Sequence, residues 1–156
     1  MHRKLIVAMF GAGLMLAAPL AAQAQPDYGT GRHPHYMHAM SDVSVAYLLV
    51  RRHGGDEGPV RHEEERAMVA IQYAFSTLQN AATVVRKDPD YQPPADNTDF
   101  DHRGRLHRAL DLLHDARDAV DVPEDDHDAR PLKARALGQI DAALHATEDA
   151  IRAYGY

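Results

Sequence analysis

The fold is decided by a stretch in the second half of the chain, Leu106-His107-Arg108-Ala109-Leu110-Asp111-Leu112-Leu113-His114-Asp115-Ala116-Arg117-Asp118-Ala119-Val120. Its apolar residues return every three or four positions, which is the period of an α-helix with one buried face. Charged residues and histidines occupy most of the other positions, so the opposite face is expected to meet solvent. The stripe expected to pack inward is Leu106, Leu110, Leu113, Ala116 and Val120.

The same periodicity appears in three other segments, so helices are predicted over about residues 34–52, 60–85, 102–120 and 129–153. The last three share a motif in which a large apolar residue stands three positions before an alanine, and a second alanine follows seven residues later. Alanine lets helices approach closely. Because no strand-like alternation appears, the sequence predicts an all-α fold, an antiparallel four-helix bundle. The motif residues are Ile71, Ala74 and Ala81; Leu106, Ala109 and Ala116; Ile140, Ala143 and Ala150.

The N-terminus has the three parts of a secretory signal peptide. Met1-His2-Arg3-Lys4 is basic, an apolar run follows from Leu5 to Leu16, and Ala22-Gln23-Ala24 is a cleavage signature. The apolar run is too short to span a bilayer comfortably. The predicted organisation is therefore a cleaved signal peptide over 1–24, a flexible segment over 25–33 and the bundle over 34–156. The product is expected to be exported, either periplasmic or secreted.

Charge restricts the partners of the mature chain. Removing Arg3 and Lys4 leaves 15 basic against 23 acidic side chains, a net charge of −8 with neutral histidines. Such a surface repels phosphate backbones, so nucleic acid is not an expected partner. No later segment is apolar for long enough to give stable membrane insertion after cleavage. The chain has no cysteine, which excludes disulfides and thiol chemistry.

Motifs of catalysis and of cofactor binding are missing from the sequence. The three serines, Ser41, Ser44 and Ser76, stand in helical patterns and not in a nucleophile elbow. His62 begins a run like the zinc-protease motif, but Arg66 stands where its second histidine is required. Without Cys-x-x-Cys-His there is no covalent haem attachment. The protein is therefore not expected to be an enzyme, and no cofactor is assigned from sequence.

The high number of histidines is the one feature of the sequence that suggests a specific chemistry. Ten of the eleven histidines follow the predicted signal peptide. Helical geometry places most of them away from the apolar stripes, beside carboxylates one turn along the helix. Two sets could bind a Zn, Cu or Ni ion weakly. One alternative is that they only solubilise an exposed face, because paired surface ligands rarely complete a tetrahedral site. The first set is His107, Asp111 and His114, and the second is His35, His38 and Asp42.

Three segments carry a resemblance to other proteins: His33-Pro34-His35-Tyr36-Met37-His38-Ala39-Met40-Ser41-Asp42-Val43, Gly104–Leu110 and Ile140–Glu148. The first resembles the opening of a group of small exported bacterial helical proteins of uncharacterised function, which implies a helical fold and no particular activity. The histidine-bearing pattern is also loosely similar to small periplasmic metal-binding helical bundles, in which histidine spacing is denser.

Two functions follow as hypotheses. The first is an exported, non-catalytic bundle that binds a divalent transition metal weakly through surface histidine and carboxylate stripes. The alternative is a structural or envelope-stress interaction protein, an adaptor whose exposed helix faces meet a protein partner and which has no metal role.

Overall fold

The computed structural model describes residues 33–52, 58–87 and 100–155. They form four helices and, within these ranges, no strand: α1 (Tyr36–Arg51), α2 (Pro59–Val84), α3 (His102–Val120) and α4 (Ala129–Tyr154). The predicted all-α class is confirmed, and each predicted helix end lies within two residues of the observed one. The predicted signal peptide lies outside the described residues.

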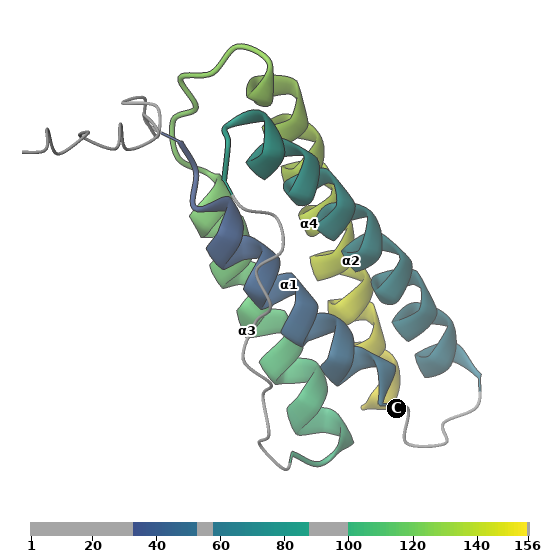
Figure 1. Ribbon diagram of the computed structural model, residues 1–156. Helices are drawn as coiled ribbons and strands as arrows, with labels where there is room; N and C mark the ends of the chain where they lie inside the picture. The colour runs from purple at the N-terminus through teal and green to yellow at the C-terminus, as the bar shows by residue number, and fades with distance from the viewer. Residues whose placement is uncertain (1–32, 53–57, 88–99, 156) are drawn as a thin grey trace, which may run out of the picture.

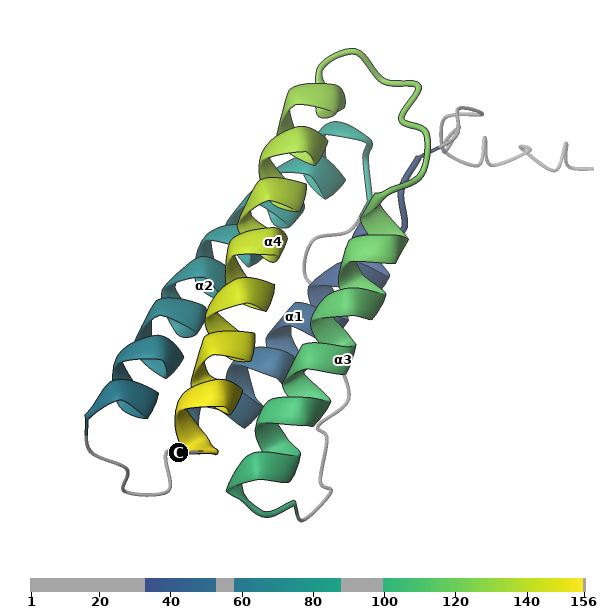
Figure 2. The same ribbon diagram turned by 180° about the vertical axis from the view of Figure 1, so that it is seen from behind.

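The helices pack as a square (Figures 1 and 2). α1 contacts α2 and α3, and α4 contacts the same two helices, so α1 and α4 lie on one diagonal and α2 and α3 on the other. In both views α1 and α4 run in one direction and α2 and α3 in the opposite one. Every neighbouring pair is therefore antiparallel, which confirms the predicted antiparallel four-helix bundle.

The order of the helices in space has one consequence for the chain path. α2 ends at the end of the bundle where α4 begins, whereas α3 begins at the opposite end. The end of α2 and the start of α3, which follow each other in the sequence, therefore lie at opposite ends of the bundle.

The core is built on alanine. The six alanines of the repeated motif have no exposed surface, and the large residues before them are at most 1% exposed. Leu110 of the predicted α3 stripe is only partly buried, although it packs against the core. Tyr154, the last residue of α4, is 41% exposed.

Asp101 begins α3. Its side chain accepts a hydrogen bond from the backbone N–H of Gly104 at 2.6 Å, which satisfies one of the unpaired donors of the first turn. A Cβ on Gly104 would lie 2.8 Å from the Asp101 Oδ1 atom, so glycine gives the cap the space it needs. Asp101 is therefore the N-cap of α3.

The N-cap of α4 is Asp128, which makes no side-chain cap bond; Asp126, two residues earlier, binds the start of the helix instead. Its Oδ1 atom accepts from the backbone N–H groups of Asp128, at 2.8 Å, and Ala129, at 3.0 Å. These two bonds hold the pKa of the Asp126 carboxyl below its ordinary value. In the ranges that the structure describes, no helix is long and apolar enough to cross a membrane.

The cap of α3 gives a testable prediction. Asp101→Ala removes the acceptor for the Gly104 N–H and is expected to lower the free energy of unfolding by about 1 kcal/mol. Asp101→Asn keeps a side-chain oxygen at the same position and should stay close to the wild type. Urea unfolding followed by circular dichroism measures both, and an equal loss in the two variants would contradict the cap.

Candidate functional site

Asp42 is the polar residue of α1 that departs most from its expected environment. The sequence placed it on a face that flanks or opposes the apolar stripe, but the side chain is buried, with 8% of the residue exposed. The expectation was wrong because α3 packs against this part of α1. A signal was present: Asp42 stands three residues after Ala39 and four before Ala46, and both alanines are fully buried.

His38 and Asp42 form a pair one helical turn apart. The Nε2 atom of His38 lies 3.4 Å from the Oδ2 atom of Asp42, and the imidazole is mostly exposed while the carboxylate is not. Among the described residues, the Oδ2 atom has no hydrogen-bond partner. The pair therefore joins a solvent-facing nitrogen to an unsatisfied, buried oxygen.

The electrostatics of Asp42 are set by two helices. Burial raises the pKa of the Asp42 carboxyl, because desolvation disfavours the charged form, and Asp115 of α3 raises it further. His38 and Arg108 act in the opposite direction. The net effect is a pKa above the ordinary value. The positive charges near the ionised Asp42 carboxylate therefore do not offset the cost of its burial.

A hollow of about 470 Å³ lies at the start of α1. Its lining includes His33, His35 and His38, together with Lys87 from just beyond the end of α2. The second predicted ligand set is therefore partly brought together: His38 contacts Asp42, and His35 lines the same hollow as His38. Asp115, which sequence reasoning did not include, adds a negative charge near the pair.

The first predicted set lies on the outer face of α3. His107, Asp111 and His114 are all exposed, as the helical wheel predicted. Within the described part of the chain, no hydrogen bond or ion pair joins them. Over residues 33–52, 58–87 and 100–155, no group of three or more histidine, aspartate or glutamate side chains is arranged to hold a metal ion. Neither set is thus a closed metal centre.

Two histidines are structural, which the sequence did not predict. The Nδ1 atom of His33 lies 2.6 Å from the Oε1 atom of the buried Glu124, and the Tyr36 hydroxyl donates to Oε2 at 2.6 Å. Burial and this hydrogen bond raise the pKa of the Tyr36 hydroxyl, so it remains a protonated donor. These contacts hold the start of α1 on the link between α3 and α4.

A second buried pair lies at the other end of the bundle. Glu64 of α2 is 1% exposed, and its Oε1 atom lies 2.6 Å from the Nε2 atom of His102. The His102 ring also contacts the ring of Tyr154, with centroids 4.9 Å apart. The partners stand 38 residues apart for His102 and 91 for His33, so no local pattern could have identified them.

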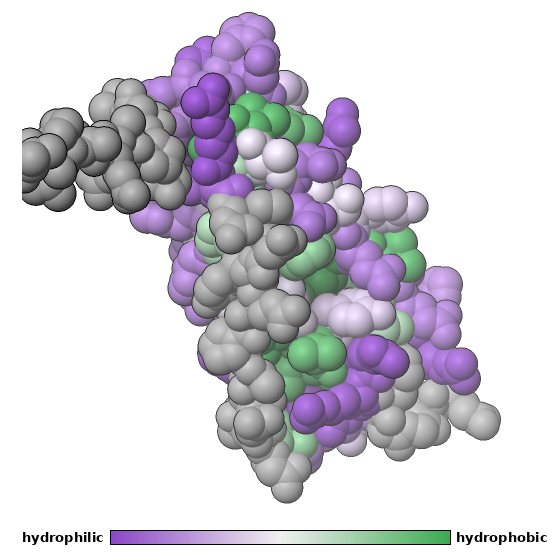
Figure 3. Space-filling model, viewed as in Figure 1, coloured by the Kyte–Doolittle hydropathy of each residue, from purple (hydrophilic) through white to green (hydrophobic). Residues whose placement is uncertain are grey.

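Two hollows lie along seams between helices. The one between α1 and α2 measures about 310 Å³ and is mostly apolar; on this face, hydrophobic side chains show between hydrophilic ones (Figure 3). Across it the Gln72 Nε2 atom donates to the Tyr47 hydroxyl at 3.0 Å.

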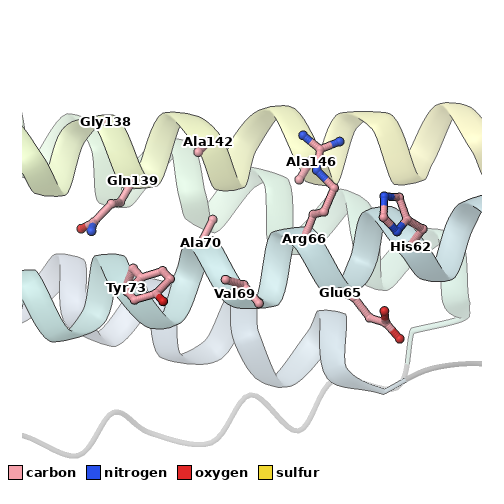
Figure 4. A pocket seen from close by; sticks show the side chains of 10 residues that line it. All are labelled: His62, Glu65, Arg66, Val69, Ala70, Tyr73, Gly138, Gln139, Ala142 and Ala146. Atoms are coloured by element: carbon pink, nitrogen blue, oxygen red, sulfur yellow. The ribbon is translucent and has the colours of Figure 1, made fainter.

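The second hollow, between α2 and α4, measures about 510 Å³ (Figure 4). Its lining includes Val69, 51% exposed, and Tyr73, 62% exposed. These are the two most exposed large hydrophobic residues of the described chain. We call this hollow the α2–α4 groove.

Comparison of the chain with protein-family models, curated proteins and solved structures finds no significant match.

The environment of Asp42 predicts a pH-dependent effect on stability. Because the folded-state pKa lies above the ordinary value of 3.8, stability is full below that value and is lost as the pH rises through the folded-state pKa. Asp42→Asn removes the charge, so it should raise the melting temperature at pH 7, and the gain should disappear by about pH 3.5. Thermal unfolding across this pH range measures the effect. A loss of stability at pH 7 would contradict it.

Proposed function

We propose that this protein is an exported, non-catalytic bundle that binds a divalent transition metal ion weakly, principally at His38 and Asp42. The observation that carries the proposal is the Asp42 Oδ2 atom, which is buried, lacks a hydrogen-bond donor and lies 3.4 Å from an imidazole nitrogen. A buried carboxylate in this state is stabilised by a cation placed beside it. His35, which is exposed and lines the same hollow as His38, is a further candidate ligand.

The chemistry of the pair favours a borderline metal ion. Imidazole suits Zn²⁺, Cu²⁺ and Ni²⁺, whereas the all-oxygen shells preferred by Mg²⁺ and Ca²⁺ are not available here. Two protein ligands leave the remaining positions to water, so affinity is low and exchange is fast. Arg108 and Lys87 lie near enough to oppose a cation, which also limits the affinity.

Export is part of the proposal, and its support is the N-terminal sequence. Cleavage after Ala24 would leave Gln25 as the first residue, which the intact mass of the protein purified from its native compartment would report. Outside the cytoplasm, weak exposed ligands meet metal ions that are less tightly controlled than inside the cell.

Calorimetric titration with CuCl₂, NiCl₂ and ZnCl₂ at pH 7.5 tests the metal proposal. We expect saturable binding with a Kd below about 1 mM, which corresponds to about −4.1 kcal/mol. His38→Ala and Asp42→Asn should each raise the Kd about tenfold, or by about 1.4 kcal/mol. Because Asp42→Asn is expected to stabilise the fold, its loss of binding would not reflect unfolding.

A matched control lies on α4, where the Nδ1 atom of the exposed His145 is 3.7 Å from Glu148. This pair has no buried oxygen, so His145→Ala should leave the Kd unchanged. A double variant, His107→Ala with His114→Ala, tests the α3 set in the same way. Absence of saturable binding below 1 mM, or equal effects of His38→Ala and His145→Ala, would contradict the proposal.

The alternative function, interaction with a protein partner, is favoured by a different observation, the α2–α4 groove with its exposed Val69 and Tyr73. If the groove binds a protein partner in the cell, the protein in cell extract migrates as a complex. Val69→Glu should then lower the apparent mass of the native species that contains the protein. Val84→Glu is the matched control, because Val84 is an exposed valine of the same helix outside the groove. Equal migration of the two variants would contradict this role.

A further inference from the structure

Asp115 of α3 is an exposed carboxylate near the His38–Asp42 pair. Among the described residues, its side chain makes no hydrogen bond and no ion pair. Its negative charge repels that of Asp42, which contributes to the raised pKa of the Asp42 carboxyl. A cation placed between two carboxylates that repel each other stabilises both of them.

One backbone hydrogen bond fixes the register of α1 against α3. The His35 N–H donates to the carbonyl oxygen of Ala119 at 3.0 Å, so residue 35 lies level with about residue 119. Because the two helices are antiparallel, residues 38 and 42 lie level with about residues 116 and 112. Asp115 therefore lies between these two levels. At 1.5 Å per residue it is displaced along the helix axis by about 1.5 Å from His38 and about 4.5 Å from Asp42.

Asp115 also lies on the flank of α3 next to α1. Among the described helices, α3 packs against α1 and α4. The Arg117 side chain donates to Asp141 of α4 at 2.8 Å, which marks the flank toward α4. At about 100° per residue, Asp115 lies about 160° around the helix from Arg117. It is thus on the other side of the buried stripe that contains Leu113 and Ala116.

Asp42 lies on the matching flank of α1. Its carboxyl is affected by both Arg108 and Asp115, which stand seven residues apart on one face of α3. His38 precedes Asp42 by one turn on the same side of α1. The imidazole and the two carboxylates are therefore brought together at the seam between α1 and α3, and Asp115 comes from a different helix than the other two.

The three side chains do not already form a closed site, as no group of three in the described part of the chain is arranged to hold an ion. Asp115 is the one of the three that can adjust. Its carboxylate is exposed and pairs with no described residue, so rotation about its side-chain bonds breaks no contact. Exposed side chains change rotamer within nanoseconds.

We propose that Asp115 of α3 is a third protein ligand of the metal site, so that the ion binds across the seam between α1 and α3. The inference rests on the proposed metal function and adds a ligand to the same site. One imidazole nitrogen and two carboxylate oxygens are ligands that Zn²⁺ and Ni²⁺ accept. Asp115 takes one of the positions that a two-ligand site leaves to water.

Calorimetric titration of the purified protein with NiCl₂ at pH 7.5 tests the role of Asp115. Asp115→Asn removes the ligand and should raise the Kd about tenfold. Asp118→Asn is the matched control, because Asp118 is an exposed aspartate of the same helix on its outer face. It loses the same charge, and its Kd should change by less than about twofold, because exposed charges are screened.

A substitution that replaces the ligand separates coordination from charge. Asp115→His supplies an imidazole nitrogen but no negative charge at pH 7.5. If Asp115 coordinates the ion, Asp115→His should bind Ni²⁺ at least about tenfold more tightly than Asp115→Asn. In a His38→Ala background this difference should disappear, because the ion is shared with His38. Circular dichroism should show an unchanged fold in all variants, because residue 115 is exposed.

Equal Kd values for Asp115→Asn and Asp118→Asn, or for Asp115→His and Asp115→Asn, would overturn the third ligand. A gain from Asp115→His that persisted in the His38→Ala background would also overturn it. In each case the metal function at His38 and Asp42 would stand if His38→Ala alone still weakened binding. Absence of saturable binding by the wild type would contradict both proposals.

Discussion

Close approach of the four helices at alanine positions is the constraint on which the rest of the structure depends. The motif alanines have no exposed surface, and each allows a large residue of a neighbouring helix to pack against backbone. Where alanine and glycine lie on an outer face instead, as on α4 at Gly138 and Ala142, the same property leaves an open floor. The close packing of the core and the open floor of the α2–α4 groove therefore both result from small residues on the helix faces.

A core of small alanine side chains does not by itself select one arrangement of the helices, because small side chains interlock weakly. The buried carboxylates add that specificity. Glu124 holds the start of α1 through Tyr36 and His33, and at the other end Glu64 holds His102. A buried acceptor without its donors is costly, so a different pairing of the ends would leave these groups unsatisfied.

The histidines accordingly divide into two classes. His33 and His102 are partners of buried glutamates and belong to the architecture. Most of the others are exposed, and one of them, His38, lies beside a carboxylate whose burial is not compensated. The number of histidines alone would favour every exposed histidine–carboxylate pair equally as a metal site. The burial of Asp42 distinguishes the His38–Asp42 pair from the others.

The sequence by itself determined the four helices, their ends within two residues, the alanine faces and the one-turn spacing of His38 and Asp42, because periodicity, capping and helical spacing are local properties. It did not determine that α2 and α3 lie on a diagonal, that Asp42 is buried or that Glu64 and Glu124 have histidine partners. Only the tertiary structure decided these, because each depends on which helix faces which. Contacts between residues 38 or 91 positions apart arise from packing and have no signature in the local sequence.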